Sequence, residues 1–128
     1  MSFPKKFTLT GTTASDGSLT CYSTSANGPA YAFGRVIAVV YTFDDFDAGS
    51  TMTLSTEGTG QTIWTEANVD ATAIRYPRLQ VHSSAGVART YNGTQPVCVA
   101  PMVCHERLKM IVASGGDSKK GTWDVYVD

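Results

Sequence analysis

Apolar and polar residues alternate along most of the chain, which is the two-residue period of β-strands with one buried face. Thr, Val, Tyr and Phe are frequent inside the alternating runs, and Gly, Asn, Asp and Ser fall between them. Helical periodicity is nearly absent, and only residues 65–74 could hold a turn of helix. The pattern predicts strands joined by turns over residues 5–11, 17–25, 34–43, 50–58, 60–67, 88–99 and 106–128.

The most apolar run, Val36 to Tyr41, is apolar at every position and predicts a central strand covered on both faces. The clearest hairpin is centred on Glu57-Gly58-Thr59-Gly60, and its first strand would turn Met52 and Leu54 together towards the core. Two further hairpin-turn signals are Asp16-Gly17 and Asn92-Gly93.

Two alternating strands with a Gly-, Ser- and Lys-rich loop between them end the chain. One is expected to bury Leu108, Met110 and Val112, and the other Trp123, Val125 and Val127. About eight to ten short strands at roughly 8–12 residue spacing are what a β-sandwich, a jelly roll or a closed barrel requires. At 128 residues the chain is expected to form one domain over 1–128, with residues 1–6 as a mobile N-terminal arm.

Charge limits the partners that this domain can have. Charged residues are 16% of the chain, and ten Lys and Arg against eleven Asp and Glu leave a net charge of -1. No basic field exists to hold a phosphate backbone, so no nucleic acid partner is expected. No secretory signal or run of about 18 apolar residues is present, so we expect no membrane partner and synthesis in the cytosol.

Two groups of residues have side chains that could bind a metal ion. Asp44, Asp45 and Asp47 resemble the opening of a calcium loop, but Gly49 falls one position early, so an acidic turn is favoured over a calcium site. Four further N and S donors could hold a zinc ion, but their spacing is irregular and reduced, buried cysteines are favoured. These donors are His82, Cys98, Cys104 and His105, and the third cysteine is Cys21.

Catalytic machinery is not recognisable in the sequence. His82 and His105 are the only histidines and lie in no motif, and neither a nucleophile elbow nor a phosphate-cradling glycine loop is present. We therefore expect a protein that is not an enzyme and needs no cofactor. Aromatic residues could alternatively form a sugar-binding platform, although most are expected in packing: Tyr22, Tyr31, Tyr41, Trp64, Tyr76, Tyr91, Trp123 and Tyr126.

Arg75-Tyr76-Pro77-Arg78 is the most distinctive short segment. Pro77 removes a backbone donor and favours an extended Tyr76, so the segment is predicted to be a strand edge or a tight corner. Arg75 and Arg78 could each hold a carboxylate bidentately. Whether they brace this chain or clamp a neighbouring subunit stays open.

The chain resembles a family of small tailed-phage and prophage structural proteins, the capsid decoration or cement proteins. The resemblance spans residues 33–128 and follows the order Tyr-Pro-Arg, Val-His, Thr-Tyr-x-Gly-Thr and Arg-Leu-Lys. The matching residues are Tyr76, Pro77, Arg78, Val81, His82, Thr90, Tyr91, Gly93, Thr94, Arg107, Leu108 and Lys109. Arg75 stands where the family often has a second aromatic residue, and Cys98, Cys104 and His105 look peculiar to this chain.

The resemblance implies a jelly-roll-like antiparallel β-sandwich that binds, as a dimer or trimer, to the outside of a phage head. Its partner would be the major capsid protein, at junctions between capsid subunits. The candidate interface is Phe3, Pro4, Lys5, Lys6, Arg75, Tyr76, Pro77 and Arg78. Alternative functions are a carbohydrate- or receptor-binding module of a virion and, less favoured, a small hydrolase or metal enzyme.

Overall fold

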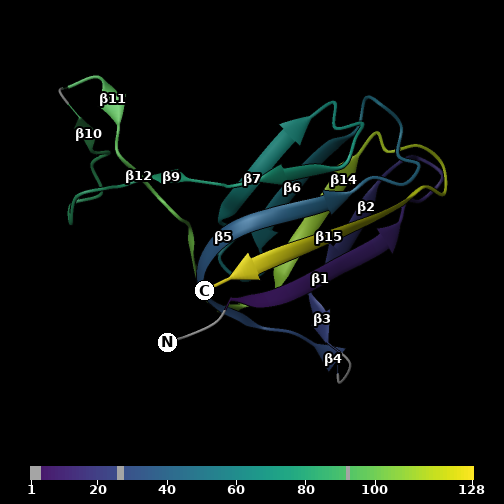
Figure 1. The fold of residues 1–128 in the computed structure, drawn as a ribbon, viewed down its shortest axis with the longest axis horizontal. Helices are drawn as coiled ribbons and strands as arrows, with labels where there is room; N and C mark the ends of the chain where they lie inside the picture. The colour runs from purple at the N-terminus through teal and green to yellow at the C-terminus, as the bar shows by residue number, and fades with distance from the viewer. Residues whose placement is uncertain (1–3, 26–27, 92) are drawn as a thin grey trace.

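Two antiparallel β-sheets pack face to face in the computed structural model, which describes residues 4–25, 28–91 and 93–128 (Figure 1). The first sheet has the order β13-β5-β15-β1-β3-β4, with β8 also paired to β5. The second has the order β2-β14-β6-β7. The strands of the first sheet are β1 (Lys5–Thr12), β3 (Thr24–Ser25), β4 (Gly28–Pro29), β5 (Ala32–Thr42), β8 (Ala73–Arg75), β13 (Met102–Glu106) and β15 (Lys120–Val127). Those of the second are β2 (Leu19–Tyr22), β6 (Thr51–Thr56), β7 (Thr62–Ala67) and β14 (Leu108–Ala113).

The strand order is that of a jelly roll. One sheet contains β1, β15, β5 and the β8/β13 edge in that order, and the facing sheet contains β2, β14, β6 and β7. Consecutive strands such as β1 and β2, or β14 and β15, therefore lie in different sheets. This arrangement confirms the predicted all-β, jelly-roll-like sandwich. No helix of membrane-spanning length and hydropathy occurs in the part of the chain that the structure describes.

The alternation of the sequence becomes the inner faces of the two sheets. Met52 and Leu54 of β6 are fully buried, as predicted for the hairpin that turns between β6 and β7. Trp123 of β15 stacks on Tyr41 of β5 with ring centroids 5.6 Å apart, and its indole N–H donates to the Met52 sulfur at 3.3 Å across the sandwich. The expected inner faces are also buried: Leu108, Met110, Val112, Val125 and Val127.

The central strand β5 is paired on both sides, as predicted, to β15 and to the β8/β13 edge. Its inward residues Val36, Val39 and Tyr41 are at most 1% exposed, whereas Ile37 and Val40 on the other face are half-buried. The all-apolar run therefore reflects a strand with one face in the core and one partly covered face.

Two predictions about connections were wrong. Asp16-Gly17 does form a turn, with Gly17 at φ 84°, but β1 and β2 on either side pair with β15 and β14 instead of each other. The turn therefore joins the two sheets. Residues 65–74 form no helix: residues 65–67 belong to β7 and 73–74 to β8. In the loop between them Val69 is buried, and its carbonyl accepts the Ser50 hydroxyl at 3.1 Å.

Part of the expected N-terminal arm lies in a sheet. Lys5 and Lys6 already belong to β1, where they pair with Val127 and Tyr126 of β15, so assigning these two residues to a mobile arm was wrong. The ladder hydrogen bonds with a buried neighbouring strand hold them in place. Of the expected arm, residues 1–3 lie outside the described residues.

A long excursion interrupts the edge of the first sheet. β8 and β13 run in the same direction along one side of β5, and residues 78–100 between them leave the sandwich; we call these residues the inserted arm. It contains β9 (Leu79–Gln80), β10 (Thr90–Tyr91), β11 (Gln95–Pro96) and β12 (Cys98–Val99). β9 pairs with β12 and β10 with β11, and Figure 1 shows the inserted arm projecting away from both sheets.

Candidate interaction site

The inserted arm begins and ends at buried prolines, Pro77 and Pro101. Between them no described side chain is buried, because the two short ladders have no second layer to cover them. A two-stranded ribbon of this kind is marginal in water by itself. The strands expected at residues 88–99 therefore exist, but they do not join the sandwich.

Apolar side chains are exposed on the inserted arm and at its base. Val87 is 63% exposed and Val99 48%, and Tyr76 just before the arm is 64% exposed. The backbone of the arm is nevertheless well paired: Arg89 N–H donates to the Val81 carbonyl at 2.7 Å, and Val81 N–H to Val97 at 2.7 Å. The arm is thus an ordered projection with an uncovered apolar surface, which is typical of a contact element.

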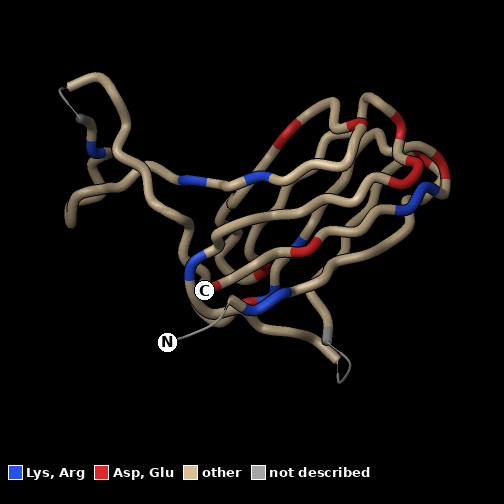
Figure 2. The backbone as a smooth tube through the Cα atoms, in the orientation of Figure 1, with Lys and Arg blue, Asp and Glu red and all other residues tan. Residues whose placement is uncertain are grey.

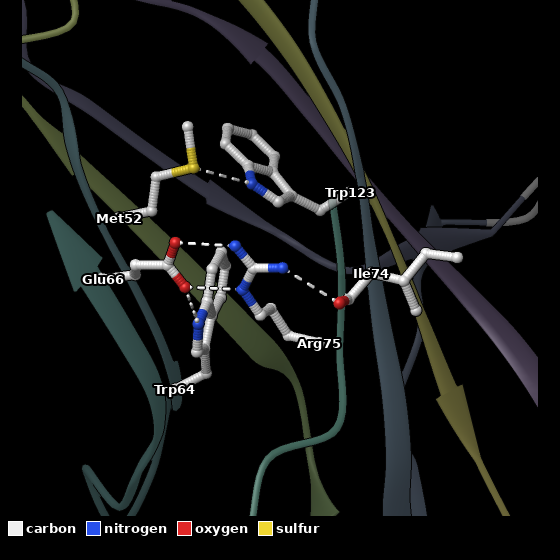
Figure 3. A network of polar contacts seen from close by, with 6 residues as sticks. All are labelled: Met52, Trp64, Glu66, Ile74, Arg75 and Trp123. Carbon is white, nitrogen blue, oxygen red and sulfur yellow. Dashed lines mark hydrogen bonds and ion pairs between the residues drawn. The ribbon is translucent and has the colours of Figure 1, made fainter. Parts of the chain in front are cut away.

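Arg75 connects the two sheets beside the arm. Its Nε donates to Glu66 Oε1 at 2.7 Å and its Nη2 to Glu66 Oε2 at 2.9 Å, a bidentate pair between β8 of one sheet and β7 of the other (Figure 3). The indole N–H of Trp64 donates to the same carboxylate at 3.3 Å. Hydrogen bonding from Arg75, more than from Trp64, holds the pKa of Glu66 below its ordinary value of 4.5. Arg75 therefore braces this chain.

Arg78 has a different environment. Its Nη1 donates to the carbonyl of Pro77 at 2.6 Å, and no carboxylate of the described residues pairs with it. It is exposed, as is Tyr76, whereas Pro77 is buried. The predicted corner is therefore divided: Arg75 is an internal brace, and Tyr76 and Arg78 face outwards at the start of the inserted arm.

The remaining candidate interface residues lie at the start of β1. Pro4, Lys5 and Lys6 are exposed, and Phe3 lies outside the described residues. Sheet pairing places Lys5 and Lys6 beside the C-terminal end of β15, at the end of the sandwich from which the inserted arm projects (Figure 1). The two candidate segments thus share one end of the molecule.

Two open cavities in the part of the chain that the structure describes lie near these segments. One of about 470 Å³ lies at the base of the inserted arm and is lined by Gln61, Leu79, Val81, Val99, Pro101 and Met102, among others. The other, of about 490 Å³, lies between the end of β7 and β8; we call it the edge pocket. Its lining residues are Glu66, Asn68, Val69, Asp70, Ala71, Thr72, Ala73, Ile74 and Arg75.

The donors considered for metal do not converge. No group of three or more His, Cys, Asp or Glu side chains that could hold a metal ion occurs among the described residues. Asp45 Oδ1 instead accepts the backbone N–H of Lys120 at 2.8 Å, and Asp47 N–H donates to the Gly115 carbonyl at 3.0 Å. The acidic turn after β5 is thereby tied to the loop before β15.

The expectation of three buried cysteines was wrong for two of them. Cys21 is 8% exposed, and burial raises the pKa of its thiol to about 11. Cys98 is exposed because β12 has no covering layer, and Cys104 because alternation along β13 puts Val103 inside and its neighbours outside. All three are free thiols.

The aromatic residues divide between core and surface. Tyr41, Trp64 and Trp123 are buried, as packing predicts, whereas Tyr31 is 53% exposed and stacks on His105 with ring centroids 5.2 Å apart. His105 lies in a bulge of β13 with φ 57°. Tyr22 is covered by the Arg107 guanidinium, 4.3 Å above the ring, and Arg107 also pairs with Glu57. Tyr31 precedes β5 and stacks on β13, whereas Tyr76 follows β8 at the base of the inserted arm.

No family model matches the chain, and neither a curated protein nor a solved structure matches it significantly.

Proposed function

We propose that this chain is a structural protein of a phage head, a decoration protein that binds the outside of the shell at junctions between major capsid proteins and stabilises it. The observation that carries the proposal is the inserted arm: residues 78–100 leave a rigid sandwich, and their described side chains are all at least partly exposed. Ordering such a segment costs conformational entropy that its own contacts repay poorly. A neighbouring subunit in an assembly would cover it.

The resemblance to decoration proteins indicates which assembly would cover the inserted arm, namely a phage head. It includes Tyr76, Pro77 and Arg78 at the base of the inserted arm, and Thr90, Gly93 and Thr94 within it. The family-like residues therefore concentrate in the part of the chain that contributes least to the core. Because these residues add little to the core, a role in contact with a partner accounts for their placement better than a role in folding.

The jelly roll suits a protein that acts by binding. Its core is closed by side chains from both sheets, including the Trp123 and Met52 contact, so the sandwich forms a rigid base for the arm. A clamp that binds the assembled shell more tightly than its separated parts stabilises the shell by mass action. Lys5, Lys6 and Arg78 are exposed at the end of the sandwich from which the inserted arm projects, which we call the arm end. Together with the base of the inserted arm they would contact the shell.

The test is direct binding to expanded heads that lack a decoration protein. Purified chain should bind in a fixed stoichiometry and raise the temperature at which the heads release their DNA. A variant in which residues 78–100 are replaced by a short Gly-Ser linker should lose both effects, while Cys21→Ser, which changes no exposed group, serves as a binding control. Absence of binding by the unaltered chain would exclude the proposal.

A further inference from the structure

Formal charge is distributed unevenly along the sandwich. The end opposite the inserted arm consists of four connections, residues 13–18, 43–50, 68–72 and 114–119, which hydrogen bond to one another; we call it the loop pole. With Lys120 at the start of β15, it has six carboxylates against two lysines, a formal charge of -4. The charged residues are Asp16, Asp44, Asp45, Asp47, Asp70, Asp117, Lys119 and Lys120.

The arm end has the opposite sign. It holds six basic residues against three acidic ones, a formal charge of +3: Lys5, Lys6, Arg35, Arg78, Arg89 and Arg107 against Glu57, Glu106 and Asp128. Figure 2 shows a group of acidic residues at the loop pole and basic residues along the inserted arm. Residues 78–100 contain two arginines and no Asp or Glu. A chain with a net charge of only -1 thus has its negative and positive charges separated between its two ends.

The edge pocket borders the loop pole through residues 68–72 and extends along β8 to Arg75. Ala71, Ala73 and Ile74 give it apolar walls, and Ile74 is 52% exposed. Asp70 is an exposed carboxylate in its lining. Arg75 and Glu66 also line the pocket, but they satisfy each other in the bidentate pair and hold β8 against β7. The pocket therefore has a braced apolar wall and one carboxylate, Asp70, that forms no ion pair with the described residues.

The tip of the inserted arm, which we define as residues 87–89, has side chains that complement the apolar wall and the carboxylate of the edge pocket. Val87 is 63% exposed and Arg89 is exposed, and no carboxylate of the described residues pairs with Arg89. The segment is extended, with Ala88 bridged to His82, so side chains two positions apart point to the same side. Val87 and Arg89 thus offer an apolar group and a cation side by side.

We infer that the arm tip of one copy docks in the edge pocket of a second copy of this chain, with Val87 against Ile74 and Ala71 and Arg89 paired with Asp70. The inserted arm projects away from both sheets, whereas the edge pocket lies between β7 and β8 of the sandwich, so the tip of the arm does not lie at the pocket of its own molecule. The acidic loop pole of one copy and the basic inserted arm of another complement each other head to tail. Such a contact is heterologous, and repeating it gives a ring or a chain of copies. The inference goes beyond the proposed function, since it requires no phage head.

Sedimentation analysis of the purified chain at low and high salt is the first test. We expect association of the unaltered chain, weakened in about 1 M salt, where charges are screened beyond about 3 Å. Arg89→Glu and Asp70→Arg should each weaken association by about tenfold or more, and the double variant should recover it. Lys5→Glu and Asp117→Arg are matched controls, because each makes the same kind of charge reversal at a residue outside the proposed contact. These two variants should associate as strongly as the unaltered chain does.

A mixing experiment tests the head-to-tail geometry. A variant without the inserted arm keeps only its pocket, and Asp70→Arg keeps only its arm, so each alone should be monomeric and their mixture should form a 1:1 dimer. A monomeric unaltered chain at about 100 μM, or charge variants that associate normally, would overturn the inference. Association followed by failure to bind heads would overturn only the proposed function, and head binding by a monomer only this inference.

Discussion

Arg75 and Met102 lie on the same side of β5, opposite Val39 and Arg35, although the whole inserted arm separates them in the chain. Their partners are four positions apart on one strand, a span of ~13 Å. β8 and β13 therefore act as one edge strand with residues 78–100 inserted in it. The sandwich does not need the insertion to close its sheet.

Removal of the inserted arm is expected to leave the sandwich folded. With residues 78–100 replaced by a short Gly-Ser linker, no described buried side chain is lost, so the free energy of unfolding should change by less than about 1 kcal/mol. Urea denaturation followed by tryptophan fluorescence measures this, since Trp64 and Trp123 are both buried. A loss of the cooperative transition would show that the arm is part of the folding unit.

Arg75→Ala and Arg78→Ala should differ in their effect on stability. Arg75 forms a bidentate pair with Glu66 that joins the two sheets at a half-exposed site, so its loss should cost about 1 kcal/mol, while Arg78→Ala should cost nearly nothing. Arg75→Lys should not restore the stability, because an ammonium cannot reproduce the two parallel bonds.

Melting temperatures of these variants, with a double-mutant cycle through Glu66→Ala, give the coupling between Arg75 and Glu66. Equal effects of Arg75→Ala and Arg78→Ala would contradict the division of the corner into an inner brace and an outward-facing residue.

The sandwich could be predicted from the sequence because alternation reports which side chains a strand buries. Met52 with Leu54, and Trp123 with Val125, occupy the expected inner faces, and the β6–β7 hairpin has the expected turn. The sequence did not predict which of the two sheets each strand joins. Asp16-Gly17 specifies a turn but not whether the strands beside it pair with each other or enter different sheets, because that depends on partners remote in the chain.

The inserted arm could not be predicted for a related reason. Residues 88–99 have the composition of strands, and they do form short ladders. Burial, however, requires a second layer, and nothing in the alternation of Val97 and Val99 shows that none covers them. The edge pocket depends on Glu66 and Arg75, which meet only through the pairing of β8 with β5. The sequence indicated that Arg75 and Arg78 could each hold a carboxylate, but not which carboxylate or which of the two arginines.

Acid should destabilise the protein partly through Glu66. Its folded-state pKa lies below the ordinary 4.5, chiefly because Arg75 hydrogen bonds to the charged form. Folding therefore gains stability from this group above about pH 4.5, and the gain is lost as the pH falls through the lower folded-state pKa. Glu57 and Glu106, whose pKa values are lowered first by Arg107 and by the Thr59 backbone N–H, add to the same trend.

Urea denaturation between pH 7 and about pH 3 measures this dependence. Glu66→Gln should make the decline in unfolding free energy below pH 4.5 shallower, and Arg75→Ala should do the same because it removes the cause of the shift. Identical pH slopes for both variants and the unaltered chain would show that the pair does not contribute to acid sensitivity.

The three thiols should react at very different rates in the folded protein. Cys98 and Cys104 are exposed, whereas Cys21 lies in the core beneath Gly11 and Leu19, and burial raises its pKa to about 11. Only the thiolate reacts rapidly, so at pH 8 a disulfide reagent should modify two thiols promptly and the third only when the sandwich opens. Cys21→Ser should leave the prompt reaction unchanged, while Cys98→Ser and Cys104→Ser should each remove half of it. Prompt reaction of all three thiols in native protein would contradict the packing of β2 against β1.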